Sequence, residues 1–449
     1  MRVRIVEFAD ELKNYNYYQD EKIIALNPCS QSYFKNRNIQ FENSLNFFGL
    51  EGHIAISKKS KKIMESVNNL YSFNDKHNLK ICYSACVYDW ILLYLRYLLI
   101  TLYIIDKIIK KYNPTEVIIP KSTSIENFDS YCSPKDRLLG HLVKKYIKGN
   151  NLNIKIIEEE NNKIKTNTNF QSIKKNSKKI ISYISFVIFK FFFRKKNIYF
   201  VTDDSHNINT LVDLIKLKKP DLKPVFFSLS KGGLIKYGKS ILKGSIFSFF
   251  LGDFFLDNKD KKKIQKSIND FNYNLSTSSS VKHEITYKKV NLLDEVNLFI
   301  SSVVLKNLIE FNSKVNILVK IIKISNPKFM ISQHTRLMGC AFGELSNIYK
   351  IPAMVISHGS HVYHEEPEAN FEWEVFSKAM INKIFPYIAA QNLHMLNFLE
   401  KSGYSKDQIV NTGPLIYKKF DTSKERIKEL KKNILKENCD KKIILHAGT

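Results

Sequence analysis

Cysteine is scarce and scattered in this chain. The six cysteines include no C-x-x-C pair and form no even framework; they are Cys29, Cys82, Cys86, Cys132, Cys340 and Cys439. Such spacing argues against a disulfide scaffold, and it is typical of a protein in a reducing compartment. The first residues, MRVRIVEFADELK, carry acidic side chains where an export signal has its apolar core. We therefore expect a cytoplasmic protein.

Acidic residues are too few to balance the basic ones. The chain has 70 Lys and Arg against 43 Asp and Glu, a net charge of +27. This excess favours anionic partners such as nucleic acid, phosphorylated substrates or an anionic membrane face. The sequence contains no zinc-finger spacing, no RNP-like glycine-aromatic motif and no single basic recognition helix. Nucleic acid is therefore not expected as a partner.

Uninterrupted apolar runs of bilayer length are also missing. The run 87–105 is interrupted by Asp89 and Arg96, which share one helical face with Tyr103, so we expect a packed amphipathic helix. The run 180–193 has only fourteen residues. Its basic flanks and aromatics fit a helix lying on an anionic leaflet, and a buried helix opening the second domain is the alternative.

Residues 1–160 are predicted to form an accessory α/β domain without a glycine-rich phosphate loop. Apolar runs at 22–26, 116–119 and 153–157 predict strands, and 30–36 and 137–147 predict helices. A long helix is expected to end at Asn113-Pro114. Residues 161–195 then supply a basic linker and the apolar amphipathic helix.

A second unit is expected from residue 196 to 420. Short apolar strands are predicted at 197–202, 225–229, 329–332, 353–356, 387–390 and 409–410. Helices are predicted at 210–218, within 290–324, and at 338–349 and 393–401. Short buried strands alternating with helices indicate a parallel sheet covered on both faces. Ligands of such sheets bind beyond the carboxyl ends of the strands.

Polar residues follow these predicted strands where a ligand would bind. Six of the 15 glycines and six of the 11 histidines lie in residues 331–449. We expect the residues after the strands to line one cleft: Asp203, Asp204, Gln333, His334, Arg336, His358, Gly359, Ser360, His361, Gln391, Thr412 and Gly413. The alternative for Arg336 is an ion pair with Glu344 or a solvated side chain, and for the others ordinary turn residues.

The ordered succession SQHTR, IPAMVISHGSH, PYIAAQ, IVNTGPLIY and IILHAGT resembles bacterial surface-polysaccharide glycosyltransferases of the two-lobed GT-B type. It is also distantly similar to the CDP-glycerol glycerophosphotransferases. The resemblance implies GT-B-like Rossmann lobes with parallel sheets, in which 196–420 is the acceptor lobe. Residues 421–449 would begin a donor lobe that is largely missing, with Gly448 and Thr449 at the donor phosphate.

The resemblance also implies an activity. It is transfer of a sugar from a nucleotide-sugar, with no further cofactor and no obligatory metal, to a surface glycan or lipid-linked acceptor. The transfer would take place at the inner face of the plasma membrane, as a step in capsule or lipopolysaccharide synthesis. The alternatives are a glycerophosphotransferase or sugar 2-epimerase of the same fold, and a non-catalytic assembly protein. The fragment as given is expected to bind a nucleotide-sugar poorly.

His358 is the expected general base, because it follows a buried strand and precedes a glycine that lets the chain turn. The same part is assigned to the histidine of the His-Gly pair in the resembling glycerophosphotransferases. Glu365 or Glu366 is the alternative base. His358, His361 and His364 are spaced by three, but Gly359 and Val362 disfavour a helix and no fourth ligand is evident, so we expect no metal.

Overall fold

The computed structural model describes most of the chain to residue 413 and short pieces beyond it. The described residues are 1–12, 21–73, 75–122, 138–159, 183–184, 186–187, 189–191, 197–202, 206–227, 239, 247–248, 258–357, 361–366, 381–413, 425 and 428–429.

The first sheet is built from residues 2–159 and all its strands are parallel. Its order is β3 (Glu42–Asn43), β2 (Glu21–Ala25), β1 (Arg2–Val6), β4 (Glu116–Pro120) and β5 (Lys155–Glu159). The helices along this part of the chain are α1 (Pro28–Lys35), α2 (Leu50–Val67), α3 (Ile81–Tyr112) and α4 (Leu139–Gly149). This order, 3-2-1-4-5, is that of a doubly wound Rossmann-like sheet.

The second sheet has the same arrangement with two further strands, again all parallel. Its order is β8 (Phe247–Ser248), β7 (Lys223–Phe226), β6 (Ile198–Val201), β11 (Met330–Ser332), β12 (Ala353–Val355), β13 (Tyr387–Ala390) and β14 (Ile409–Asn411). Its helices include α6 (His206–Lys218), α13 (Met338–Tyr349) and α15 (Leu393–Lys401). The predicted α/β class with parallel sheets is confirmed.

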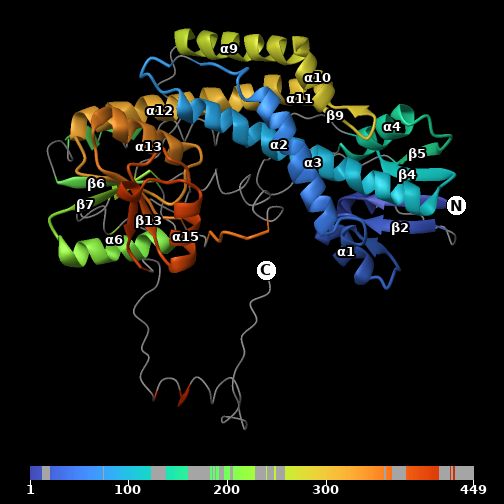
Figure 1. Cartoon of the computed structure of the whole chain (residues 1–449), viewed down its shortest axis with the longest axis horizontal. Helices are drawn as coiled ribbons and strands as arrows, with labels where there is room; N and C mark the ends of the chain where they lie inside the picture. Colours follow the sequence, from blue (N-terminus) through green and yellow to red (C-terminus); the bar gives the residue numbers. More distant parts are fainter. Residues whose placement is uncertain are drawn as a thin grey trace.

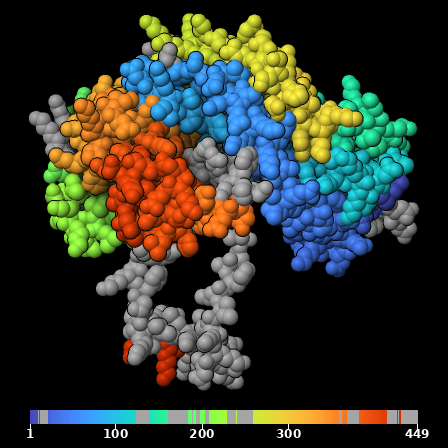
Figure 2. Space-filling model, viewed as in Figure 1, coloured from blue at the N-terminus to red at the C-terminus, as the bar shows by residue number. Residues whose placement is uncertain are grey.

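A helical layer joins the two sheets. We call the first sheet with its helices the first lobe and the second sheet with its helices the second lobe. It comprises α9 (Asn258–Thr277), α10 (Ser279–Glu284), α11 (Leu293–Phe299), a π-helical turn (Ile300–Val304) and α12 (Leu305–Ser325), with a hairpin of β9 (Thr286–Tyr287) and β10 (Val290–Asn291). Figure 1 shows α9 and α12 above α2 and α3, which run from the second sheet toward the first. In Figure 2 the yellow helices of this layer lie along the top of the molecule, above the blue helices. One hydrophobic core runs through both lobes and this layer.

Helix α3 confirms the packed helix predicted for the 87–105 run. Its Arg96 is 6% exposed and donates from Nη1 to Ser57 Oγ on α2 at 2.9 Å. Asn113 ends the helix in the left-handed conformation with φ +40°. Among the helices that the structure describes, none is long and apolar enough to cross a membrane.

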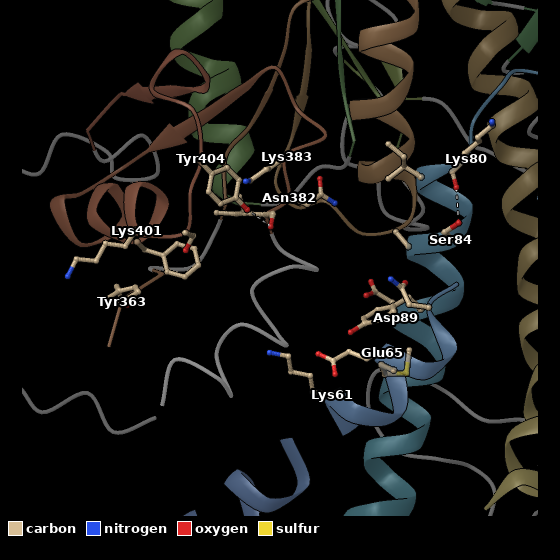
Figure 3. Close-up of a pocket in the computed structure, with 18 residues that line it drawn as sticks. Lys61, Glu65, Lys80, Ser84, Asp89, Tyr363, Asn382, Lys383, Lys401 and Tyr404 are labelled. Carbon is tan, nitrogen blue, oxygen red and sulfur yellow. Dashed lines mark hydrogen bonds between the residues drawn. The ribbon is translucent and has the colours of Figure 1, made fainter. Parts of the chain in front are cut away.

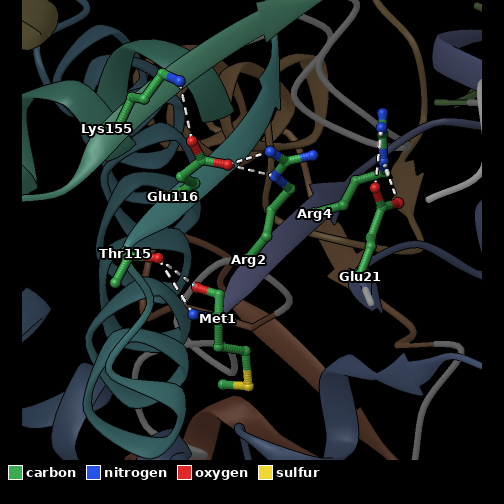
Figure 4. A network of polar contacts seen from close by, with 7 residues as sticks. All are labelled: Met1, Arg2, Arg4, Glu21, Thr115, Glu116 and Lys155. Carbon is green, nitrogen blue, oxygen red and sulfur yellow. Dashed lines mark hydrogen bonds and ion pairs between the residues drawn. The ribbon is translucent and has the colours of Figure 1, made fainter. Parts of the chain in front are cut away.

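Strand β1, at the centre of the first sheet, is not among the predicted strands. Arg4 within it is 2% exposed and pairs with Glu21 on β2, Nε to Oε1 at 2.5 Å, and with Glu159 on β5. Arg2 donates from Nε to Glu116 Oε2 at 2.7 Å, and Lys155 donates to the other oxygen of Glu116 (Figure 4). These ion pairs make a strand with two arginines compatible with a buried sheet.

Candidate functional site

The carboxyl ends of β6, β11, β12, β13 and β14 lie at one edge of the second sheet, because all the strands run the same way. We call the described polar residues at this edge the strand-end site: Thr202, Ser332, Gln333, His334, Arg336, Ser357, His361, Gln391, Thr412 and Gly413. The reversal of strand order falls between β6 and β11, where ligands of doubly wound sheets bind.

The end of β11 is held by hydrogen bonds to its own loop. Ser332 Oγ donates to His334 O at 2.6 Å and lies 3.3 Å from Thr202 Oγ1 on β6. The backbone N–H of Arg336 donates to His334 Nδ1 at 3.3 Å. A neutral His334 ring therefore carries its proton on Nε2.

Gly339, in the first turn of α13, allows this loop to fold back on the helix. A Cβ at this position would lie 2.1 Å from His334 O and 2.8 Å from Ser332 Oγ. Leu337, just before the helix, has φ +45°, which is costly for a residue with a Cβ. The loop between β11 and α13 is therefore tightly constrained at the point where the sequence predicts substrate contacts.

Three residues from two strand ends are hydrogen-bonded together beside β12. Ser357, fully buried, hydrogen-bonds through Oγ to His361 Nε2 at 3.0 Å. Gln391 Nε2 donates to Ser357 O at 2.5 Å, which ties the end of β13 to the end of β12. His361 is 5% exposed and its ring stacks on Phe398 of α15. Ser357 and His361, the residues on either side of 358–360, are thus hydrogen-bonded to each other.

The end of β14 completes the edge. Thr412 N donates to Ala390 O at 3.1 Å, and Gly413 follows with φ +66°. A Cβ on Gly413 would meet nothing within 4 Å, so its backbone conformation, and not lack of space, requires glycine there.

Arg336 pairs with a carboxylate that sequence reasoning did not assign to the site. Its Nε lies 3.9 Å from Oδ2 of Asp89 on α3, a helix of the first lobe. Burial raises the pKa of Asp89 to about 6, and the charge of Arg336 opposes that rise. The expected alternative, an ion pair of Arg336 with Glu344, is wrong, because Glu344 accepts hydrogen bonds from the start of α3.

We expect Asp89→Asn to remove part of the pH dependence of stability. The folded protein keeps a proton on Asp89 up to about pH 6, whereas the unfolded chain loses it near pH 4. Wild-type stability attributable to this group therefore falls as pH rises from about 4 to 6, by up to about 3 kcal/mol.

Urea unfolding of wild type and Asp89→Asn at pH 4, 5, 6 and 7 measures this difference. Arg336 and the buried thiols of Cys86 and Cys340 remain around the site in both proteins. Asp294→Asn is the control, because that side chain is 91% exposed. Parallel pH profiles for wild type and Asp89→Asn would contradict the assignment.

The remaining predicted residues divide into two groups. Glu365 and Glu366 are exposed, and His361 is buried. The residues that lie outside the described part of the chain are His358, Gly359, Ser360, Asp203, Asp204, Gly448 and Thr449. Their assignments stay predictions.

Metal binding is not favoured by the described residues. Within that part of the chain no three histidine, cysteine, aspartate or glutamate side chains are grouped so as to hold an ion. Of the three histidines spaced by three, His361 is engaged by Ser357.

Several residues of this region were missed from sequence. Ser332, Ser357 and Thr202 are small and neutral, and only their place at strand ends could have indicated them. Asp89 carries a stronger signal, because a carboxylate inside an otherwise apolar helix requires a partner.

No protein family and no curated protein matches the chain. Solved structures similar to it include UDP-GlcNAc 2-epimerases. That of Neisseria meningitidis, bound to UDP-GlcNAc, is 10% identical with a TM-score of 0.20 over 90% of both chains. A putative one from Listeria monocytogenes is 9% identical with a TM-score of 0.18, over 89% of this chain and 86% of that chain. That of Methanocaldococcus jannaschii is 14% identical with a TM-score of 0.15, over 98% and 100%. At these values the likeness carries no argument about the site.

Proposed function

We propose that the chain belongs to an enzyme that transfers a sugar from a nucleotide-sugar to a hydroxyl of a surface glycan or lipid-linked acceptor. The observation that carries the proposal is the strand-end site. Polar groups from five neighbouring strands converge at the edge of a doubly wound sheet where such folds bind ligands.

The residues of the edge have distinct parts in this proposal. His358 takes the proton of the attacking hydroxyl, and Glu365 or Glu366 is the alternative base. Ser357 and His361 hold the flanks of that segment, and Gln391 fixes the neighbouring strand end. Gln391 Oε1 is buried and receives no hydrogen bond from the described chain, so it is available to a donor brought by substrate.

Binding of the substrates involves the other predicted residues. His334 and Arg336 are suited to the anionic part of a substrate, with Gln333 and Thr412 meeting sugar hydroxyls. Asp203, Asp204, Gly359 and Ser360 would line the same edge. Gly448 and Thr449 would meet the donor phosphates, and the basic surface would allow contact with an anionic membrane face.

A sugar 2-epimerase of the same fold, the alternative that the sequence left open, is the second candidate. It is distinguished by its chemistry, because epimerisation at C2 of the sugar needs no acceptor, whereas transfer does.

The test incubates the full-length protein with nucleotide-sugars, UDP-GlcNAc among them, with and without glycan acceptors. Sugar transfer predicts release of nucleotide that depends on the acceptor, and a new glycosidic linkage detected by mass spectrometry and NMR. Formation of a C2 epimer without acceptor would favour the epimerase. Turnover of no nucleotide-sugar in either arm would contradict both activities and favour the non-catalytic alternative.

A further inference from the structure

A cavity of about 1000 Å³ lies between the first lobe and the second, and none of the residues of the strand-end site lines it. Helices α2 and α3 form one wall, and the segment before β13 and the end of α15 form the other (Figure 3). We call it the lysine cleft after four of its lining residues, Lys61, Lys80, Lys383 and Lys401.

The charges of the cleft favour an anion. Its carboxylates are Glu65 and Asp89, and Asp89 is already paired with Arg336. Within the described part of the chain, no carboxylate lies in ion-pair distance of Lys80, Lys383 or Lys401. Ammonium groups in a concave, partly apolar site attract anions more strongly than the same groups on an open surface.

Two of the lysines are held by aromatic rings of the same wall. Lys401 Nζ lies 4.6 Å from the ring centroid of Tyr363, and Lys383 Nζ lies 5.6 Å from that of Tyr404. The Tyr404 hydroxyl in turn donates to Ile381 O at 3.1 Å. Cation–π contacts of this kind position the charges without neutralising them.

The rest of the lining is suited to a saccharide. Amide and hydroxyl groups line it together with the ring of Tyr88: Asn68, Ser84, Tyr88, Asn382 and Ser402. Amides and hydroxyls can exchange hydrogen bonds with sugar hydroxyls, and aromatic rings offer apolar faces to sugar C–H groups. The volume is at the upper end of the range for small-molecule sites, enough for several sugar units.

The cleft adjoins the strand-end site at two points. Asp89 lines the cleft and pairs with Arg336 of that site. Tyr363 lines the cleft and follows His361, whose ring is fixed to Ser357. A chain lying in the cleft can therefore extend to the strand ends.

We propose that the lysine cleft binds an acidic saccharide, a sugar chain bearing carboxylate or phosphate groups, which is the acceptor. Naming it as the acceptor rests on the proposed function, whereas the binding of an acidic saccharide does not. The acceptor would lie between the lobes with its reactive end at the strand-end site.

The experiment measures binding by titration calorimetry, with no turnover required. The probes are an oligogalacturonate, a neutral dextran oligosaccharide of equal length and a DNA oligonucleotide of equal charge. Lys383→Glu/Lys401→Glu should raise the Kd for the oligogalacturonate about tenfold or more. Lys262→Glu/Lys263→Glu makes the same charge change on the exposed face of α9 and should change it less than about twofold.

Each other outcome has a definite meaning. Equal weakening by both double variants, equal binding of dextran, tighter binding of DNA, or displacement of the oligogalacturonate by UDP would overturn the proposal. Wild-type binding that depends on the cleft lysines, without turnover of any nucleotide-sugar, would support the cleft and count against the proposed function. Turnover of a nucleotide-sugar, together with a Kd for the oligogalacturonate that Lys383→Glu/Lys401→Glu does not change, would support the proposed function and overturn the proposal for the cleft.

Discussion

Under the proposed function, replacing His358 with alanine in the full-length protein is expected to lower the rate of sugar transfer by about 10²- to 10⁴-fold, the usual contribution of a general base. Thermal stability should stay near that of wild type. The physical reason is that a sugar hydroxyl is a weak nucleophile until a neighbouring base takes its proton. Imidazole has a pKa close to ambient pH and is suited to that task.

The described residues on either side of the 358–360 segment are joined to each other and to the end of β13. Ser357 and His361 are buried and hydrogen-bonded to each other, and Gln391 holds the Ser357 carbonyl. A base must be held within hydrogen-bond reach of its proton.

The measurement is kcat and kcat/KM against pH for wild type and His358→Ala. Wild-type kcat/KM should rise with pH as the base loses its proton, and the variant should lose that rise. His283→Ala is the matched control, because His283 is an exposed histidine on α10. Wild-type turnover by His358→Ala would remove His358 from the mechanism, and the same loss in Glu365→Gln or Glu366→Gln would transfer the role to that residue.

The sequence predicts the second lobe well from 329 to 411 because local signals agree there. Helix α13 has the predicted bounds, and its Met338, Phe342 and Leu345 are all buried. Strand β12 begins just after Pro352, a residue that cannot continue a helix. In this region periodicity, turn residues and burial lead to the same assignment, which is why single-sequence reasoning suffices.

The rest depends on partners far away in sequence. Arg4 is compatible with a central strand because Glu21 and Glu159, 17 and 155 positions away, neutralise it. No local pattern contains that information. Asp89 and Arg336 are separated in the same way, as are the lysines that line the two walls of the cleft. Contacts between lobes are tertiary and can be identified only after the chain is folded.

Replacing Glu344 with alanine is expected to cost about 3 kcal/mol of stability. Glu344, on α13 of the second lobe, is 7% exposed and accepts from three backbone N–H groups at the start of α3 in the first lobe. The donors are Lys80 and Ile81 to Oε1, at 2.7 and 3.2 Å, and Cys82 to Oε2, at 2.9 Å. No side chain of α3 itself caps this end.

The cost has two physical sources. The first N–H groups of a helix have no partner within the helix, and leaving them buried without an acceptor costs about 1–3 kcal/mol each before relaxation. A negative charge at a helix N-terminus adds about 0.3–1 kcal/mol or more when it is partly buried. Water entering the space left by Glu344→Ala would recover part of the loss, which is why we expect about 3 kcal/mol in total.

Urea unfolding measures the free energy, and amide hydrogen exchange locates the effect. Exchange at Lys80, Ile81 and Cys82 should accelerate in Glu344→Ala more than exchange in the middle of α3. Glu400→Ala, an exposed carboxylate on α15, is the control and should change stability by less than about 0.5 kcal/mol. If Glu344→Ala unfolded at the wild-type urea concentration, with unchanged protection at the start of α3, the carboxylate would not be what joins α3 to the second lobe.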